Sequence, residues 1–267
     1  MAIGDSYRLI QKTPYEAFVA GVIGTTDLHS HIRLRPVLKF LRTHLGSCAQ
    51  ELSVLEIGCG NGVNAFELSK IAERCRKRVR YEGVDFNSKA IELAQSVSAS
   101  LRLTDFAFHV DEAGAFVKRE LSRGKRLEPD LVLLIDVIEH IVDPVELLTA
   151  VDGLLRRGGI YAVSVPTPLY PRVFGRRMHE EVGHMVDGYT LERLDEIFVG
   201  HLRSDRILHR YSTGFISNLG CYLFYRLRGQ NRYLNFLLFL ALYPFHFLDL
   251  WNNSRISCSL FAVYRKP

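Results

Sequence analysis

The sequence predicts an α/β fold built around a parallel, doubly wound sheet. From residue 52 onward, short apolar runs with strand character alternate with segments of helical periodicity. The run DLVLLI (130–135) has no polar face, as expected of a strand covered by helices on both sides. A glycine-rich turn at 58–62 follows the first expected strand, where open α/β sheets bind their ligands. Together these three observations indicate the fold class.

The individual elements follow from local patterns along the chain. Apolar residues at helical spacing predict a first helix over 31–44, which Gly46 can end. Thr190 and Ser88 are suitable N-caps for two of the later helices. The expected strands are 52–57, 79–85, 105–110, 130–135 and 159–165, the last stopped by a proline. The expected helices after the first are 63–76, 88–99, 145–156 and 190–200.

Length and composition are those of an ordinary globular chain. Its 267 residues, 48% of them apolar and 24% charged, allow one large domain with a buried core. The five cysteines are scattered without CxxC or zinc-ligand spacing, which predicts reduced thiols in a cytosolic compartment. The N-terminus shows no basic region followed by an apolar one, so we expect no signal peptide and a cytoplasmic location.

Positive charge is concentrated in the last quarter of the sequence. Residues 201–267 contain nine Lys or Arg and two acids, whereas the whole chain carries a net charge of +5. This asymmetry suggests a polyanionic partner for the tail, either a nucleic acid or a membrane surface. A solvated basic face is the alternative.

The glycine turn has the spacing G-x-G-x-G. No Lys-Ser or Lys-Thr follows it, which excludes a P-loop. The dinucleotide fingerprint G-x-G-x-x-G would need glycine at 63, where Val63 stands. The third glycine comes one residue early, at Gly62, and this spacing alone does not identify the ligand.

Acidic residues stand at the ends of four successive strands. Glu56, Asp85, Asp111 and Asp136 mark these ends, and none of the loops there carries Lys or Arg. A pyrophosphate would be repelled by such a site, but a carboxylate at a strand end can accept the hydroxyls of a ribose. The pattern favours a ligand with an adenosine and a cationic centre.

With these motifs the sequence resembles the class I S-adenosylmethionine-dependent methyltransferases. The resemblance covers roughly residues 50–200 and rests on five stretches: VLEIGCGNG (54–62), YEGVDFN (81–87), FHVDEAG (108–114), LVLLIDVIEHIVDP (131–144) and LLRRGGIYAVSVP (154–166). It implies a Rossmann-like seven-stranded sheet with its last strand antiparallel, in which 204–210 is the sixth strand and 257–267 the last. We expect an N-terminal helical cap at 1–50 and a methyltransferase domain at 51–267. A helical insertion is expected near the C-terminus, at about 213–254.

The resemblance implies S-adenosylmethionine as cofactor and assigns residues to its methionine part. Glu56 would support the glycine turn and the amino group, and Asp136 and Val137 would face the methionine end. The turn would let the cofactor lie against its backbone through Gly58, Cys59, Gly60, Asn61 and Gly62.

Four further residues are implied for the adenosine part. Asp85 would take the ribose hydroxyls and Phe86 would line the adenine. Asp111 would take the adenine amino group, with the backbone of Glu112 beside it.

Two histidines are candidate catalytic bases. His140 closes DVIEH just beyond the fourth strand, where substrate would meet cofactor, and an oxygen nucleophile usually needs a base. His184 lies in EVGHMVDGYTLERL, which resembles a segment of the ubiquinone-biosynthesis O-methyltransferases. Local packing is the alternative role for each.

In that subgroup the matching cluster of acids and histidine can hold a divalent cation. Asp136, Glu139 and His140 would be the ligands here, and hard ligands of this kind would suit magnesium. The alternative is a helix N-terminus whose dipole favours acids.

The stretch 232–251 is nearly apolar all round and contains seven aromatic residues. Arg226, Arg228 and Arg232 stand just before or at its start. A spanning helix is disfavoured because polar residues and a proline interrupt it and a strand must follow. Either the stretch is a helical lid on the sheet, or 226–251 dips into an anionic membrane surface on the inner face.

The sequence thus predicts an S-adenosylmethionine-dependent methyltransferase acting on a small-molecule or lipid-linked acceptor, on oxygen rather than nitrogen. One alternative is a nucleic-acid methyltransferase, disfavoured because no Asn-Pro-Pro-Tyr signature and no nucleic-acid-binding module are visible. The other is a binding protein that kept the fold and lost catalysis.

Overall fold

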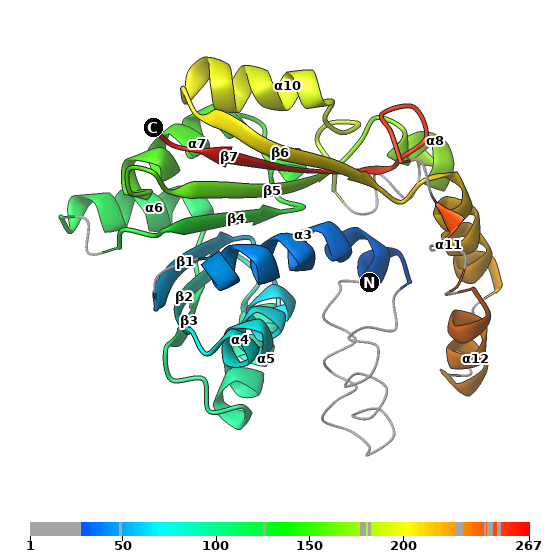
Figure 1. Cartoon of the computed structure of the whole chain (residues 1–267), viewed down its shortest axis with the longest axis horizontal. Coiled ribbons are helices and arrows are strands. Elements are labelled where there is room, and N and C mark those ends of the chain that lie inside the picture. Colours follow the sequence, from blue (N-terminus) through cyan, green and yellow to red (C-terminus); the bar gives the residue numbers. More distant parts are fainter. Residues whose placement is uncertain are drawn as a thin grey trace.

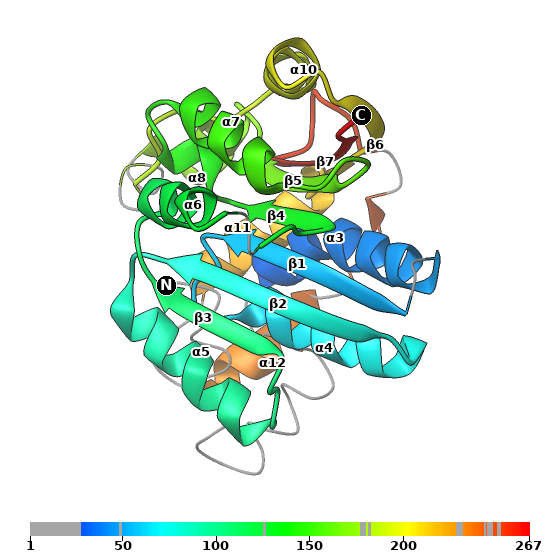
Figure 2. The same ribbon diagram turned by 90° about the vertical axis from the view of Figure 1, so that its left-hand side faces the viewer.

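The computed structural model of the chain forms one seven-stranded sheet between two layers of helices (Figures 1 and 2). It describes residues 28–47, 50–124, 127–176, 180, 183–227, 232–242, 244, 248–249 and 252–267. The strand order is β3-β2-β1-β4-β5-β7-β6. The strands are β1 (Glu51–Ile57), β2 (Arg78–Asp85), β3 (Phe106–Val110), β4 (Leu131–Ile135), β5 (Ile160–Pro166), β6 (Asp205–Ser212) and β7 (Ser259–Arg265).

Only β7 breaks the parallel arrangement, since it runs antiparallel to both β5 and β6. This confirms the expected seven-stranded sheet with an antiparallel last strand. Both C-terminal strands lie where the resemblance placed them, at 205–212 and 259–265.

The strand pleat divides the core into two halves. Val54 packs with the helices α3 (Leu28–Ser47), α4 (Val63–Cys75) and α5 (Ser88–Ser100). The next residue, Leu55, packs on the other face with α6 (Ala113–Ser122), α7 (Pro144–Leu154) and α10 (Leu191–Asp195). Every residue of β4 is buried, which explains its uninterrupted apolar run. Each fully buried aliphatic side chain contributes roughly 1.5–3 kcal/mol.

The expected boundaries agree with the strands within two residues, but one predicted cap is wrong. Asn87, not Ser88, caps α5, because its side chain accepts a hydrogen bond from the Ala90 amide at 3.2 Å. Asn87 is in the extended conformation that an N-cap needs, and Ser88 is already helical. Thr190 is confirmed as the cap of α10. Beyond α10 the chain continues as a π-helical turn (Glu196–His201).

Two helices, α11 (Phe215–Leu227) and α12 (Arg232–Leu242), lie between β6 and β7, where the insertion is expected. They pack against the first turns of α3 through a small apolar cluster formed by Ile32, Cys221, Phe224 and Leu242. Figure 1 shows both helices as an arm at one end of the sheet. Within the described part of the chain, no helix is long and apolar enough to cross a membrane.

Helix α3 shares the main core with the sheet. Its residues Val37, Leu41 and Leu45 are fully buried among side chains of β1 and α4. Residues 1–27 of the expected N-terminal cap lie outside the described residues, so the domain boundary at residue 50 stays a prediction. The four described cysteines are in no disulfide, and Cys48 is outside the described residues.

Candidate active site

The sheet has a topological switch point between β1 and β4. From β1 the chain proceeds outward through β2 and β3, whereas from β4 it proceeds in the opposite direction to β5. Ligands of open α/β sheets bind outside the carboxyl ends of the strands at such a point. Because β1 to β4 are parallel, their carboxyl ends bring the predicted strand-end residues to one edge.

The three glycines of the turn have different roles, although all have positive φ. A Cβ at Gly58 would lie 2.5 Å from the Val137 side chain, and one at Gly62 would lie 3.0 Å from the Phe66 ring. These two glycines are therefore required by packing within the protein. A Cβ at Gly60 would meet nothing within 4 Å. Gly60 is thus the glycine that leaves room for a ligand against the backbone.

The Asp85 carboxylate is fixed between two loops. Oδ2 accepts a hydrogen bond from the Gly60 amide at 2.8 Å, and Oδ1 accepts one from the Asn87 amide, also at 2.8 Å. Each carboxylate oxygen can accept a second bond, so the group can still accept two ribose hydroxyls. The end of β2 is thereby linked directly to the glycine turn.

The side chains expected around adenine lie at the ends of β2 and β3. Phe86 is 80% exposed, an unusual state for a large aromatic ring and one that suits a ligand-facing residue. Val110, which the sequence analysis did not identify, is also exposed there. The Asp111 carboxylate forms an ion pair with Arg119 on α6, and Glu112 is exposed at the helix start. Their contacts with adenine remain predictions.

Glu56 lies beneath the glycine turn and is fully buried. Its carboxylate accepts hydrogen bonds from the Asn64 amide at 2.6 Å and from the Tyr81 hydroxyl. Burial raises the pKa of Glu56 to about 7, against the opposing effect of these two hydrogen bonds. Glu56 therefore ties β1 to β2 and α4, and its contact with the cofactor amino group stays a prediction.

Asp136 faces a cation that the sequence analysis missed. Its backbone has a left-handed φ of 55°, and its carboxylate Oδ2 lies 2.5 Å from a guanidinium nitrogen of Arg33 on α3. Neither carboxylate oxygen accepts a hydrogen bond of good geometry from a described residue, so the contact is an ion pair. Burial raises the pKa of Asp136, and Arg33 opposes that rise. The guanidinium of Arg33 therefore lies at the strand ends, although α3 is far from β4 in the sequence.

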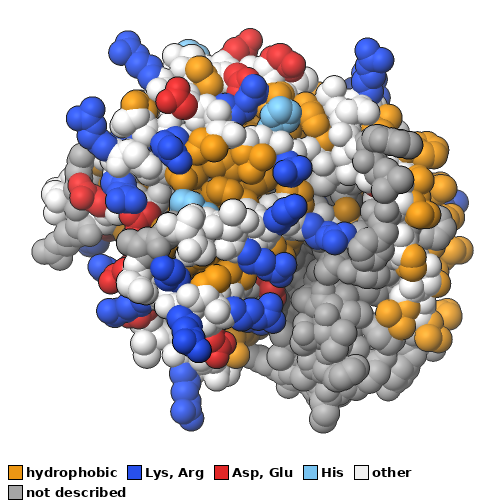
Figure 3. Space-filling model, viewed as in Figure 1, with side chains coloured by type: hydrophobic (Ala, Val, Ile, Leu, Met, Phe, Trp, Pro, Cys, Tyr) orange, Lys and Arg blue, Asp and Glu red, His pale blue; other side chains and the backbone are white. Residues whose placement is uncertain are grey.

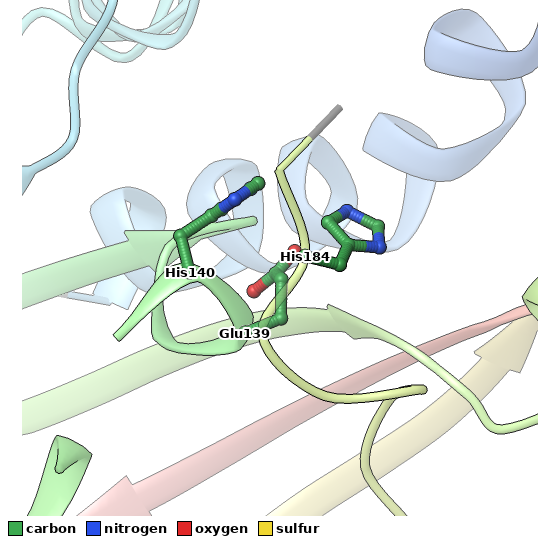
Figure 4. A group of neighbouring side chains, drawn as sticks. All are labelled: Glu139, His140 and His184. Atoms are coloured by element: carbon green, nitrogen blue, oxygen red, sulfur yellow. The ribbon is translucent and has the colours of Figure 1, made fainter. Parts of the chain in front are cut away.

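The structure brings Glu139, His140 and His184 together (Figure 4). Glu139 and His140 belong to a single 3₁₀ turn after β4, Ile138–His140, and His184 comes from the loop after α8 (Tyr170–Phe174). One potential ligand atom from each residue lies within 4.8 Å of the others. Asp136, expected in this cluster from the sequence, is not part of it, and His184 takes the third place.

Glu139 is buried with no described hydrogen-bond donor to either carboxylate oxygen. Burial, followed by the negative charge of Asp136, raises its pKa well above the usual range. An orphaned buried carboxyl group of this kind is either protonated or paired with a cation.

The tautomer of neutral His140 follows from its hydrogen bond. Its Nδ1 lies 3.0 Å from the carbonyl oxygen of Gly183, which can only accept. The neutral ring therefore carries its proton on Nδ1, and Nε2 is left with a lone pair. His140 is exposed, so this lone pair is available as a base or metal ligand.

Comparison with known families shows to which family the chain belongs. The family model described as a methyltransferase domain matches residues 49–198, which is more than half of the chain. The chain belongs to the methyltransferase-domain family. Its sheet order and antiparallel last strand are those expected of the class I S-adenosylmethionine-dependent members.

Several curated relatives of this methyltransferase-domain chain match over its central part. It is 29% identical over 115 residues to the ubiquinone biosynthesis O-methyltransferase of Cereibacter sphaeroides, covering 43% of this chain and 41% of that protein. It is 23% identical over 138 residues to the protein of the same name from Acinetobacter baylyi, covering 50% and 53%. The chain thus spans about half or less of the length of these relatives.

Solved methyltransferase structures share the fold. Geranyl diphosphate C-methyltransferase from Streptomyces coelicolor, solved with Mg²⁺, geranyl diphosphate and S-adenosyl-L-homocysteine, matches with a TM-score of 0.57 and 14% identity. That match covers 87% of this chain and 78% of the other. A SAM-dependent methyltransferase from Archaeoglobus fulgidus matches with a TM-score of 0.55 and 16% identity, over 95% and 100%.

Proposed function

We propose that the protein transfers a methyl group from S-adenosylmethionine to an oxygen of a small-molecule or lipid-linked acceptor. One observation carries the proposal: the Asp85 carboxylate is held against the Gly60 amide at the switch point of a methyltransferase-domain sheet. The family supports the reaction class, and the local similarity to ubiquinone biosynthesis O-methyltransferases supports oxygen as the acceptor atom.

The residues present fit the cofactor. The open space at Gly60 suits a ligand lying on the backbone, and the remaining lone pairs of Asp85 suit a ribose. The exposed Phe86 ring suits an adenine. When bound, S-adenosylmethionine supplies an electrophilic methyl group on a sulfonium centre, which would lie toward Asp136 and Val137.

His140 is the proposed base. As the acceptor oxygen forms its bond to the methyl carbon, the oxygen loses its proton to Nε2 of His140, and the electrons of the breaking carbon–sulfur bond stay on sulfur. An imidazole base can remove the proton of a hydroxyl efficiently only when that hydroxyl is fairly acidic. A phenol has a pKa of about 10 and is therefore more acidic than an aliphatic alcohol. We therefore expect a phenolic acceptor.

An alternative version of this proposal places a divalent cation at Glu139, His140 and His184. The orphaned Glu139 carboxylate fits a cation, and one carboxylate with two imidazoles suits Mn²⁺ or Zn²⁺ better than Mg²⁺. Such a cation would occupy the His140 lone pair. In that version the free imidazole would not be the base. The cation would instead promote loss of the proton by lowering the pKa of the acceptor hydroxyl.

Methyl-labelled S-adenosylmethionine tests the function directly. The intact protein is incubated with a panel of phenols, aliphatic alcohols and amines, and label in the organic extract is counted. We expect transfer to phenols above the level of an Asp85→Ala control. Transfer to amines alone would refute oxygen methylation, and no binding of S-adenosylmethionine would refute the function altogether.

A further inference from the structure

Among the described residues, exposed apolar side chains are concentrated on the α11–α12 arm, defined here as the described residues 215–227, 232–242, 244 and 248. In the described part of the chain, eight of the sixteen well-exposed large apolar side chains lie in this arm. They are Phe215, Leu219, Tyr222, Leu227, Leu234, Leu237, Leu240 and Leu248. Figure 3 shows apolar side chains gathered along this edge of the molecule. Exposed apolar side chains gathered in this way are typical of an interaction site.

The helices of the arm have apolar residues on two faces. The inner face packs on α3 through Cys221, Phe224 and Leu242. The outer face of α11 presents Phe215 and Leu219 at helical spacing, so packing on the rest of the protein leaves it uncovered. A helix that is apolar all round is normally buried or in contact with lipid.

The charge beside this surface has one sign. The sequence holds no Asp or Glu between Asp205 and Asp249. The Asp249 carboxylate itself accepts hydrogen bonds from the Ile216 and Ser217 amides at 2.9 and 3.0 Å, which holds it at the N-terminus of α11. Arg226 is exposed near the other end of that helix, and two more arginines follow at 228 and 232 in the sequence.

This combination distinguishes a lipid surface from a protein partner. Protein interfaces are enriched in isolated aromatic and Arg anchors, with a polar rim around them. An interfacial membrane helix combines leucine and aromatic residues with flanking cations and lacks acids. At 13 and 11 residues, α11 and α12 are too short to span a bilayer but long enough to lie on it.

The base of the arm is joined to the edge of the sheet that carries the candidate site. The Thr167 amide and hydroxyl, just after β5, donate to the Cys258 and Ser257 carbonyls, and the Cys258 amide donates to the Thr213 carbonyl. A surface docked through the arm would therefore lie close to the acceptor side of the site.

We propose that the outer face of the α11–α12 arm docks on the anionic surface of a lipid bilayer. The apolar side chains enter the interface, and the arginines contact the headgroups. The purpose of the docking, which is to supply a lipid-soluble acceptor to the site, rests on the proposed function. The docking itself does not.

Flotation with vesicles tests the docking without cofactor or substrate. The intact protein is expected to float with phosphatidylcholine–phosphatidylglycerol vesicles at low salt, and more weakly with pure phosphatidylcholine. Leu237→Ser together with Leu240→Ser should lower the partition constant about tenfold or more. The matched control, Leu101→Ser with Ile207→Ser, removes apolar groups of similar exposure elsewhere and should float as the intact protein does.

The contribution of the arginines to docking is tested with a second variant and its matched control. Changing Arg226, Arg228 and Arg232 to Gln should weaken flotation and its salt dependence. The same change at the exposed residues Arg42, Arg102 and Arg157 alters net charge equally and should have a smaller effect.

Three outcomes would overturn the proposal. The intact protein could stay unbound with anionic vesicles, or the arm and control variants could float equally. Sedimentation could instead show a dimer that the Leu237→Ser, Leu240→Ser variant dissociates, without any flotation, which would assign the face to a second copy. Calorimetry with S-adenosylmethionine on the same variants keeps this result separate from the proposed function, because vesicle docking does not require the cofactor.

Discussion

A guanidinium nitrogen of Arg33, near the start of α3, lies 2.5 Å from a carboxylate oxygen of Asp136 at the end of β4. Both side chains are only 14% exposed. The pair joins helix α3 to the point where the methionine end of the cofactor is expected. A guanidinium is also a good partner for a carboxylate of the ligand.

The first prediction concerns this pair. Arg33→Gln leaves a buried carboxylate without its cation, and we expect the free energy of unfolding to fall by about 1–3 kcal/mol. Adding Asp136→Asn should recover part of that loss, because it removes the uncompensated charge. Denaturant unfolding of the two single variants and the double variant measures the coupling. Strict additivity would show that the ion pair has no energetic role.

The second prediction concerns Glu56 and pH. Its pKa is about 7 in the folded protein and near 4.5 in the unfolded chain, so the folded state holds the extra proton between these values. The titration of Glu56 therefore lowers the free energy of unfolding as the pH rises from 4.5 to 7, by about 3 kcal/mol in all. Glu56→Gln abolishes this titration. The stability of the variant relative to the intact protein should increase across that window, measured by denaturant unfolding at each pH. A constant difference would show that Glu56 is ionised like an exposed acid.

The third prediction concerns His140. If Nε2 accepts the proton of an oxygen acceptor, His140→Ala should lower turnover by roughly 10²–10⁴-fold. Its affinity for S-adenosylmethionine should be unchanged, because the ring is hydrogen-bonded to Gly183 rather than to the glycine turn. Turnover and calorimetry on the same preparation separate the two effects. Unchanged turnover would exclude His140 both as base and as an essential metal ligand.

The fourth prediction concerns the cation. In the cation version of the proposal, activity should fall after treatment with a chelator and return with Mn²⁺ or Zn²⁺. His184→Ala should weaken binding of these ions, because the structure places His184 with Glu139 and His140. Metal binding can be followed by calorimetry without any substrate. Full activity in the chelated protein would leave Glu139 as a buried, protonated acid.

The sheet was predictable because its signals are local. Apolar runs such as 131–135 can be buried only in a covered strand, and parallel strands bring the acids at their ends to one edge. Asp85 could be identified in this way. Its bond to Gly60 was not visible in the sequence, because it depends on the path of the turn.

The parts that sequence reasoning missed depend on residues far apart in the chain. Arg33 reaches Asp136 across 103 positions because α3 packs beside β1, and no motif marks it. His184 replaces Asp136 in the candidate metal cluster because its loop crosses the turn after β4. The separate roles of Gly58 and Gly60 depend on whether a side chain or open space lies opposite each, which spacing cannot reveal.

The most direct test of the account is titration calorimetry of the intact protein and Asp85→Ala with S-adenosylmethionine and its demethylated product. The intact protein should bind both in the micromolar range. Asp85→Ala should lose the ribose hydrogen bonds, each worth roughly 1.5–3 kcal/mol, and bind at least about tenfold more weakly. The matched control is Asp105→Ala, which removes an acid at the opposite end of the sheet and should bind as the intact protein does. Equal affinity in all three proteins would contradict the role of Asp85, and no binding by the intact protein would contradict the assignment of the site.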